Sequence, residues 1–277
     1  MEYAMLVLLG LAVGAFGTLM GAGGGFLLMP VLLLVYPDHP PAGLTAISLA
    51  VVFFNAASGS YSYFRMRRVD VTSGLLFLST GIPGAVAGAL LVHSIPRQAF
   101  DLLFGLLLLG GGLLLFVRTF GAAQPPRPTN GAFTRTFKDA EGTPQSYTYN
   151  PALGLALSFG VGIVSSLLGI GGGIIHVPMM VHLLNFPVHI ATATSHFILA
   201  VMALTGTGIH VLDGSLGWGE APYVLLLGSG AVAGAQIGAR LSRRIHGRWI
   251  LRSLAVALGL VGIRILILAL APLPFFA

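Results

Sequence analysis

The sequence predicts an all-α integral membrane protein built from two inverted structural repeats, with discontinuous helices at two glycine motifs. Three observations indicate this fold: the chain is strongly apolar, its halves share motifs in the same order, and its basic residues change sides between the halves. Only 8% of its 277 residues are charged and 56% are hydrophobic, whereas soluble chains carry roughly 25% charged residues. The mean hydropathy of +0.92 therefore excludes an ordinary soluble domain.

Long apolar segments run along the whole chain, and one helical crossing of a bilayer needs about 20 apolar residues. In the first half the segments cover residues 3–20, 24–36, 42–64, 71–93 and 98–118. In the second half they cover residues 151–168, 172–185, 189–211, 220–240 and 249–271. The stretch between the halves is polar and rich in Pro, Thr and Gly, which is typical of a linker. We therefore predict a first transmembrane repeat at 1–118, a polar linker at 119–150 and a second transmembrane repeat at 151–277.

The two halves look like copies of one unit. The motif "MGAGGGFLLMP" at 20–30 has its counterpart in "LGIGGGIIHVP" at 168–178. "TAIS" at 45–48 matches "TATS" at 192–195, and "GAVAGA" occurs at both 84–89 and 230–235. Internal duplication of this kind is common in secondary transporters.

The arginines predict how the copies are oriented. In the first half, arginines follow the third apolar segment and enter the linker, which makes both regions cytoplasmic by the positive-inside rule. The equivalent loop of the second half, 210–220, has no Lys or Arg, and the next connection instead carries Arg240, Arg243, Arg244, Arg248 and Arg252. The basic bias has changed sides, which favours inverted repeats with both termini outside the cytoplasm. A parallel arrangement is the alternative, and it would leave these arginines outside.

The glycines suggest a broken helix in each repeat. Residues 3–36 are too many for one crossing and too few for two, so we expect the chain to break near mid-depth and to continue as a short helix from about Phe26. The second repeat would restart from about Ile174 in the same way. Each helix start directs free N–H groups and a partial positive charge at the break. Glycines let successive N–H groups converge on an anion, so two such ends would suit one central oxyanion.

The alternative is that the glycines only allow close helix packing, as small residues often do in membranes. The run "GGG" at 110–112 lacks the following proline and has no counterpart in the second half, and we interpret it as packing. The small residues of "GAVAGA" also predict helix contacts. A dinucleotide or phosphate loop is excluded, because no strand precedes the glycines and no lysine–serine pair follows them.

The duplicated GxGGGxxxxP motif, with "TAIS", "TATS" and "GAVAGA", resembles the sulfite exporter TauE/SafE family over nearly the whole chain except the linker. The family's motif falls on Gly21, Gly23, Gly24, Gly25 and Pro30, and on Gly169, Gly171, Gly172, Gly173 and Pro178. The resemblance implies a transporter of sulfur-containing anions in the cytoplasmic (inner) membrane of a prokaryote. The first copy departs from the pattern, since Ile47 stands where a threonine is expected.

Polar residues inside the membrane are costly and are therefore candidates for a substrate site. For this role we select Ser48, Asn55, Thr194 and Ser195, together with His176 and Gln236, which replace leucines of the other copy. The alternative for each is a hydrogen bond between helices. The histidines at 176, 182, 189 and 196 match no compact metal motif. We therefore predict no metal site, no cofactor and no catalytic residue.

The acidic residues all lie at segment ends or in loops. Proton coupling would thus have to use a histidine or the substrate itself, and facilitated diffusion is equally compatible. Arg264 is the conspicuous cation of the last segment, and we expect it to snorkel rather than to bind the anion. The chain has no cysteine, which excludes thiol chemistry.

The sequence thus predicts a membrane transporter of a small anion, held between two glycine breaks. The expected partners are that anion and the lipid bilayer. The sequence leaves open whether the chain forms a homo-oligomer. A nucleic-acid partner is not expected, because no basic run is interleaved with aromatic residues. The alternatives are a transporter of other small anions such as carboxylates, and a membrane-embedded enzyme or metal- or cofactor-binding protein that uses the histidines.

Overall fold

The computed structural model describes residues 2–36, 39–120, 133–138, 144–245 and 247–270, and these residues are mostly helical. The first half contains α1 (Glu2–Met20), α2 (Gly25–Val35), α3 (Pro41–Arg65), α4 (Val71–Leu91), η1 (Val92–Ser94) and α5 (Arg97–Phe120). A hairpin of β1 (Phe133–Lys138) and β2 (Pro144–Tyr149) follows. The second half contains α6 (Pro151–Leu168), α7 (Gly173–Leu183), α8 (Val188–Leu212), α9 (Ala221–Ser242) and α10 (Gly247–Leu270).

Six helices of the described chain are long and apolar enough to cross a bilayer, namely α1, α3, α4, α6, α8 and α9. The helices α2 and α7 are apolar but have only 11 residues each, which is short of the roughly 20 needed for a crossing. The described residues therefore agree with the expected multi-pass, all-α membrane protein, except that they also contain the β1–β2 hairpin.

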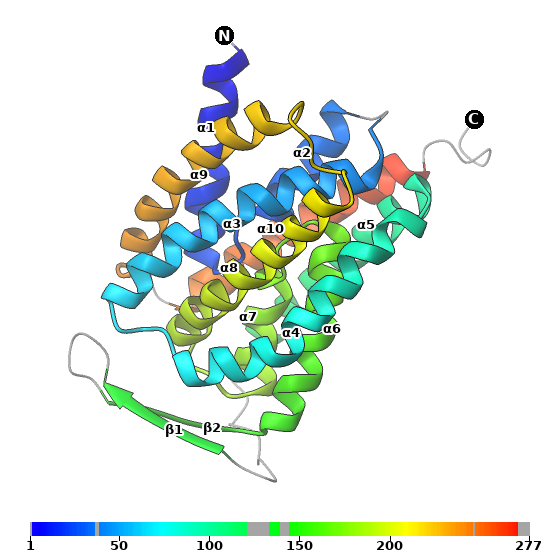
Figure 1. Cartoon of the computed structure of the whole chain (residues 1–277). Coiled ribbons are helices and arrows are strands. Elements are labelled where there is room, and N and C mark those ends of the chain that lie inside the picture. Colours follow the sequence, from blue (N-terminus) through cyan, green and yellow to red (C-terminus); the bar gives the residue numbers. More distant parts are fainter. Residues whose placement is uncertain (1, 37–38, 121–132, 139–143, 246, 271–277) are drawn as a thin grey trace.

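Helices of one half pack mainly on helices of the other half. The closest pairs are α1 with α9, α4 with α6, α5 with α10, and α3 with α8 (Figure 1). The repeated "GAVAGA" segments make two of these contacts. Gly84 and Gly88 of α4 lie directly against the backbone of α6, and Gly230 and Gly234 of α9 lie against the backbone of α1. The predicted role of these small residues in helix packing is confirmed.

The "GGG" run at 110–112 in α5 has a simpler environment. A Cβ atom added at Gly112 would lie 2.8 Å from the amide nitrogen of Gly259 in α10, whereas Gly110 and Gly111 face open space. The predicted packing role therefore applies to Gly112 alone.

Both glycine motifs interrupt the helical backbone. The first helix of each half ends immediately before its motif, α1 at Met20 and α6 at Leu168, and α2 and α7 begin at Gly25 and Gly173. Positive φ angles occur at the same three motif positions of each copy, Gly21, Gly23, Gly24, Gly169, Gly171 and Gly172. Side chains other than glycine rarely adopt this backbone conformation, so the turn requires glycine at these six positions.

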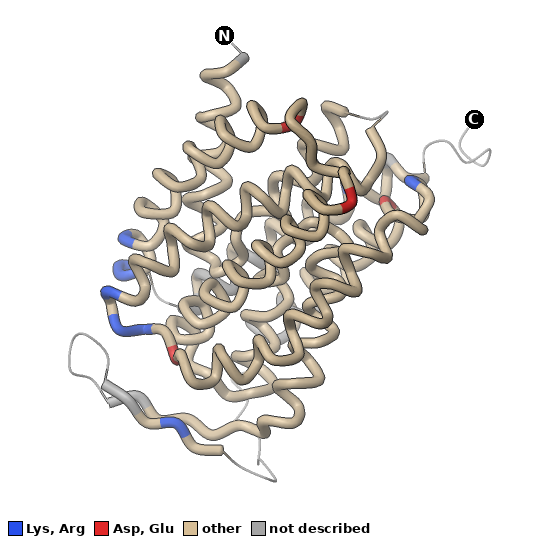
Figure 2. Tube along the Cα trace, in the orientation of Figure 1, with Lys and Arg blue, Asp and Glu red and all other residues tan. Residues whose placement is uncertain are grey.

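Most of the basic residues that Figure 2 draws gather at one end of the molecule. Figure 2 shows Lys and Arg where α3 ends and where α9 ends, and the hairpin lies at the same end of the molecule (Figure 1). Arg264 is exposed on α10. The start of α1 and the connection from α8 to α9 lie at the opposite end (Figure 1).

The linker contains structure that the sequence did not lead us to expect. Of the predicted polar linker at 119–150, residues 121–132 and 139–143 lie outside the described residues, but β1 and β2 pair antiparallel, with Phe133 opposite Tyr149. The alternating residues "FTRTFK" and "PQSYTY" suit a hairpin with one apolar face. Tyr147 and Tyr149 of this face pack on Phe186, which follows α7.

Candidate functional site

The two glycine breaks touch each other in the interior of the helix bundle. A Cβ atom added at Gly25 would lie 2.7 Å from the carbonyl oxygens of both Gly169 and Ile170. A Cβ atom at Gly173 would collide with the carbonyl oxygen of Gly21 and would lie 2.7 Å from the Cα atom of Ala22. The start of each short helix therefore packs directly against the break of the other half.

Two serines from the long helices each form a hydrogen bond with the glycine break of the opposite half. Ser48 of α3 donates a hydrogen bond of 2.6 Å to the carbonyl oxygen of Gly169, and Ser195 of α8 donates one of 3.4 Å to that of Gly21. Both serines are fully buried. The structure thus brings these two predicted site residues together with the predicted glycines, each serine on the break of the opposite copy.

Val52 and Leu199 lie one helical turn beyond these serines. A Cβ atom at Gly23 would approach both side chains, and so would a Cβ atom at Gly171, at 2.6 Å from Val52 and 3.1 Å from Leu199. Both residues are buried and occupy matching positions of α3 and α8. They form an apolar contact across the centre that the sequence analysis did not single out, because a valine and a leucine in a membrane helix carry no signal of their own.

Each break has a buried hydroxyl group without a partner. The Oγ1 atom of Thr192 and the Oγ atom of Ser165 make no hydrogen bond with any described residue. Thr192 lies against Gly21, and Ser165 lies against Gly172. An unmade hydrogen bond of a buried hydroxyl costs about 1–3 kcal/mol, so these two groups mark positions where a ligand or water is expected.

Backbone amides at the starts of α2 and α7 are also free. Among the described residues, the amides of Gly24, Gly25 and Phe26 have no hydrogen-bond acceptor, and neither do those of Gly172 and Ile174. No charged side chain belongs to either break: the segments read Gly21–Phe26 and Gly169–Ile174. Any attraction for an anion here comes from amides, hydroxyls and helix ends.

Asn55 belongs to a buried network beside the first break. Its amide nitrogen donates to the Gly14 carbonyl at 2.9 Å, and its oxygen accepts from the Thr18 hydroxyl at 2.9 Å. Thr18 is also 3.2 Å from Nε2 of His196, and its carbonyl accepts from Tyr63 at 2.7 Å. The sequence alone does not assign His196 to the site, because a single histidine on an apolar helix more often serves packing.

His176 lies apart from this network. Its Nε2 atom is 3.1 Å from the hydroxyl of Ser158, and its ring packs beside that of Phe77. The residue is buried near the start of α7, so it lies close in sequence to the second break while its imidazole is engaged by α6 and α4.

The remaining two predicted site residues bond elsewhere. The Thr194 hydroxyl accepts a 3.0 Å hydrogen bond from the backbone amide of Asp70, before α4. The amide nitrogen of Gln236 donates to the carbonyl and the hydroxyl of Ser58, at 2.9 and 2.7 Å. Both residues connect elements of the two halves, and neither contact is with a glycine break.

Asp70 holds the hairpin against the basic end of the bundle. It accepts hydrogen bonds from the Arg135 guanidinium at 3.0 Å and from the Tyr147 hydroxyl at 2.6 Å. Burial on its own raises the pKa of Asp70, but the hydrogen bonds from Arg135, Ser73 and Tyr147 outweigh it and hold this pKa below its ordinary value. Burial and the neighbouring carboxylate raise the pKa of Tyr147, so Tyr147 remains a neutral donor.

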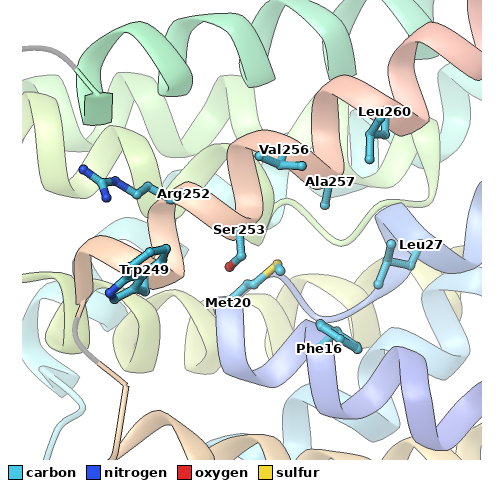
Figure 3. A pocket seen from close by; sticks show the side chains of 9 residues that line it. All are labelled: Phe16, Met20, Leu27, Trp249, Arg252, Ser253, Val256, Ala257 and Leu260. Atoms are coloured by element: carbon cyan, nitrogen blue, oxygen red, sulfur yellow. The ribbon is translucent and has the colours of Figure 1, made fainter.

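A cavity of about 480 Å³ lies beside the first break, between α1, α2 and α10. Figure 3 shows Met20 and Leu27 on one side of it, facing Ser253 and Ala257 of α10. Arg252 and Trp249 lie at one end, with the guanidinium 5.4 Å from the indole ring. The lining is almost entirely apolar, which suits hydrocarbon rather than an anion.

Comparison with known proteins agrees with this architecture. The model of the family "Sulfite exporter TauE/SafE" matches residues 6–265. The probable membrane transporter protein YunE of Bacillus subtilis (strain 168) is 33% identical, over 96% of this chain and 98% of its own. The probable membrane transporter protein MJ0441 of Methanocaldococcus jannaschii is 22% identical, over 95% of each chain.

A further relative, the probable membrane transporter protein MamO of Paramagnetospirillum magneticum, is 27% identical over 94% of this chain but only 44% of its own length. No solved structure matches the chain significantly. A match over residues 6–265 that contains both glycine motifs and both "GAVAGA" segments leaves one conclusion. The chain belongs to the sulfite exporter TauE/SafE family of membrane transporters.

Proposed function

We propose that this chain transports a small sulfur-containing anion, such as sulfite or an organosulfonate, and that it binds the anion at the two glycine breaks. The observation that carries this proposal is the set of unpartnered donors at the breaks. Ser165 places a buried, unbonded hydroxyl against Gly172, and Thr192, whose hydroxyl is also buried and unbonded, lies with its methyl group and backbone against Gly21. The free amides of Gly24 and Gly25 add donors at the start of α2.

Neutral donors suit a transported anion better than a charged side chain does. Backbone amides at a helix start are a recurrent anion site, and the helix dipole adds to their attraction. A full positive charge in the membrane interior would bind the anion strongly and would itself be costly to bury. A site of amides and hydroxyls releases its anion more readily, which transport requires.

The contact between the breaks suggests where the anion binds. Gly25 and Gly169 are too close for even one added carbon atom between them, so the anion binds beside this contact, on the side where Thr192 lies against Gly21 and Ser165 lies against Gly172. Val52 and Leu199 close the same region with apolar surface. We infer that these two side chains must separate to admit the anion from either side.

Inverted repeats provide the alternating access that such a site needs. Three observations support them: the crossed pairing of α1 with α9 and α6 with α4, the matching φ angles of the two motifs, and the gathering of arginines from both halves at one end (Figure 2).

By the positive-inside rule this basic end faces the cytoplasm. In a prokaryote the chain would then lie in the cytoplasmic membrane.

The arginines at the end of α9 support an anionic substrate. Arg240, Arg243 and Arg244 line a cavity of about 770 Å³ at the basic end. A cluster of one sign raises the local concentration of the opposite ion. The cavity would collect anions on the cytoplasmic side, which fits export.

The test is uptake into liposomes that contain the purified protein. Radiolabelled sulfite, sulfoacetate, taurine and acetate are each offered with and without a pH gradient. We expect saturable uptake of sulfite or of a sulfonate that exceeds uptake of acetate, and none in empty liposomes. Preferred uptake of acetate would identify a carboxylate transporter, and no uptake of any anion would contradict the proposal.

A further inference from the structure

Three metal-binding side chains from the two halves meet at the end of the molecule opposite the hairpin. His93 lies in η1, directly after α4, while His210 lies in the last turn of α8 and Asp213 follows it. His93 Nε2 is 2.9 Å from Asp213 Oδ2, and His210 Nδ1 is 3.4 Å from the same oxygen. One ligand atom of each residue lies within 4.8 Å of the other two.

The local fold directs Asp213 at the two imidazoles. Asp213 follows α8, and its Oδ1 atom accepts a hydrogen bond of 2.8 Å from the amide of Ser215. Gly214, with a φ of +81°, allows the chain to turn there. The turn occupies Oδ1 and leaves Oδ2 to face His93 and His210.

His210 supplies a second, independent observation. Its side chain is fully buried, yet among the described residues its Nε2 atom makes no hydrogen bond and its Nδ1 atom has only the 3.4 Å approach to Asp213. Buried polar groups are nearly always paired in folded proteins. A cation bound between Nδ1 and the Asp213 carboxylate would give this buried nitrogen a full partner.

We propose that His93, His210 and Asp213 form a binding site for a divalent transition-metal ion such as Zn²⁺. Two imidazoles and one carboxylate are ligands that Zn²⁺ accepts, and three protein ligands leave its fourth position open. Bond lengths near 2.0 Å in a tetrahedron place ligand atoms about 3.3 Å apart, close to the spacings of 2.9 and 3.4 Å seen here. Mg²⁺ and Ca²⁺ prefer oxygen ligands throughout.

The site would join the two halves of the chain. His93 belongs to the first half, whereas His210 and Asp213 belong to the second, 120 residues away in the case of Asp213. A bound ion would tie η1 to the end of α8 and restrain any movement of one half against the other. None of the three residues is among the nearest neighbours of a motif glycine, so the ion would not itself contact the transported anion.

The test is metal binding by the purified full chain. Chelator-treated protein is titrated with Zn²⁺ by calorimetry and with Co²⁺ by absorption spectroscopy. We expect one equivalent of Zn²⁺ at micromolar affinity or tighter, and Co²⁺ bands of a four- or five-coordinate site. His93→Ala and Asp213→Asn should each weaken binding at least tenfold.

His39→Ala is the matched control, because His39 is an exposed histidine outside the cluster and its loss should leave binding unchanged. His93 is itself exposed, so its replacement does not open the protein core, and the unfolding temperature without metal verifies this. Equal affinity in the wild type, His93→Ala and Asp213→Asn would overturn the proposal. So would a wild type that binds no stoichiometric Zn²⁺.

Discussion

At the scale of single residues, the glycine motifs could be predicted from the sequence and their neighbours could not. Two copies of GxGGG in apolar segments indicate a broken helix, because glycine disfavours helix and permits positive φ. Which hydroxyls meet the breaks depends on the packing of helices far apart in the chain. Ser48 and Ser195 were selected from "TAIS" and "TATS", but Thr192 of the same motif and Ser165 of α6 were not.

Thr192→Val removes the unpartnered hydroxyl at the first break while it keeps the shape of the side chain. A hydrogen bond to a charged group contributes about 1.5–3 kcal/mol, so we expect the KM for the anion to rise roughly tenfold or more. Radiolabelled uptake measures this change. Thr205→Val on the same helix is the control, because its hydroxyl bonds within α8 at 2.9 Å; an equal effect of both substitutions would argue against a binding role for Thr192.

At the scale of elements, the helices follow from hydropathy, whereas the hairpin does not. The apolar segments predicted at 42–64 and 71–93 correspond closely to α3 and α4. The Pro, Gly and charged residues of the linker predict a loop, and the alternation in "FTRTFK" and "PQSYTY" is too short to predict strands against them. The hairpin is stabilised by long-range contacts with Asp70 and Phe186, and a local pattern cannot reveal such partners.

Asp70→Asn should release the hairpin from the bundle. The substitution removes a buried carboxylate that accepts from Arg135 and Tyr147, so trypsin should cleave after Arg135 several times faster. Asp101→Asn, which breaks an ion pair with Arg97 instead, should leave cleavage unchanged. Slow cleavage in both variants would show that Asp70 does not hold the hairpin.

Acid should have the same effect as this substitution. The folded-state pKa of Asp70 lies below its ordinary value, so the carboxylate's contribution to hairpin docking is complete above the unfolded pKa of about 3.9. It is lost as the pH falls through the folded value. Hydrogen exchange of the β1 and β2 amides should therefore rise, after correction for intrinsic rates, only below about pH 4, and a rise that begins near pH 6 would assign the effect to another group.

At the scale of the whole molecule, the position of the arginines predicts the orientation of the two halves. The natural chain has no cysteine, so single cysteines can report on each face. We expect Ser146→Cys in the hairpin and Leu241→Cys at the end of α9 to react with an impermeant maleimide only from the cytoplasmic side. Trp218→Cys, at a residue that is 95% exposed between α8 and α9, should react only from outside. Labelling of Ser146→Cys and Leu241→Cys from opposite sides would contradict inverted repeats.

The central claim is that the paired glycine breaks form the anion site, and transport by Gly25→Ala and Gly173→Ala tests it most directly. Each added methyl group would enter the contact between the breaks. Gly110→Ala is the control, because that methyl group would face open space. With equal amounts of each variant in liposomes and a monodisperse wild-type-like profile in detergent, sulfite uptake should fall at least tenfold in Gly25→Ala and Gly173→Ala and persist in Gly110→Ala. Uptake at the wild-type rate in both break variants would contradict the account.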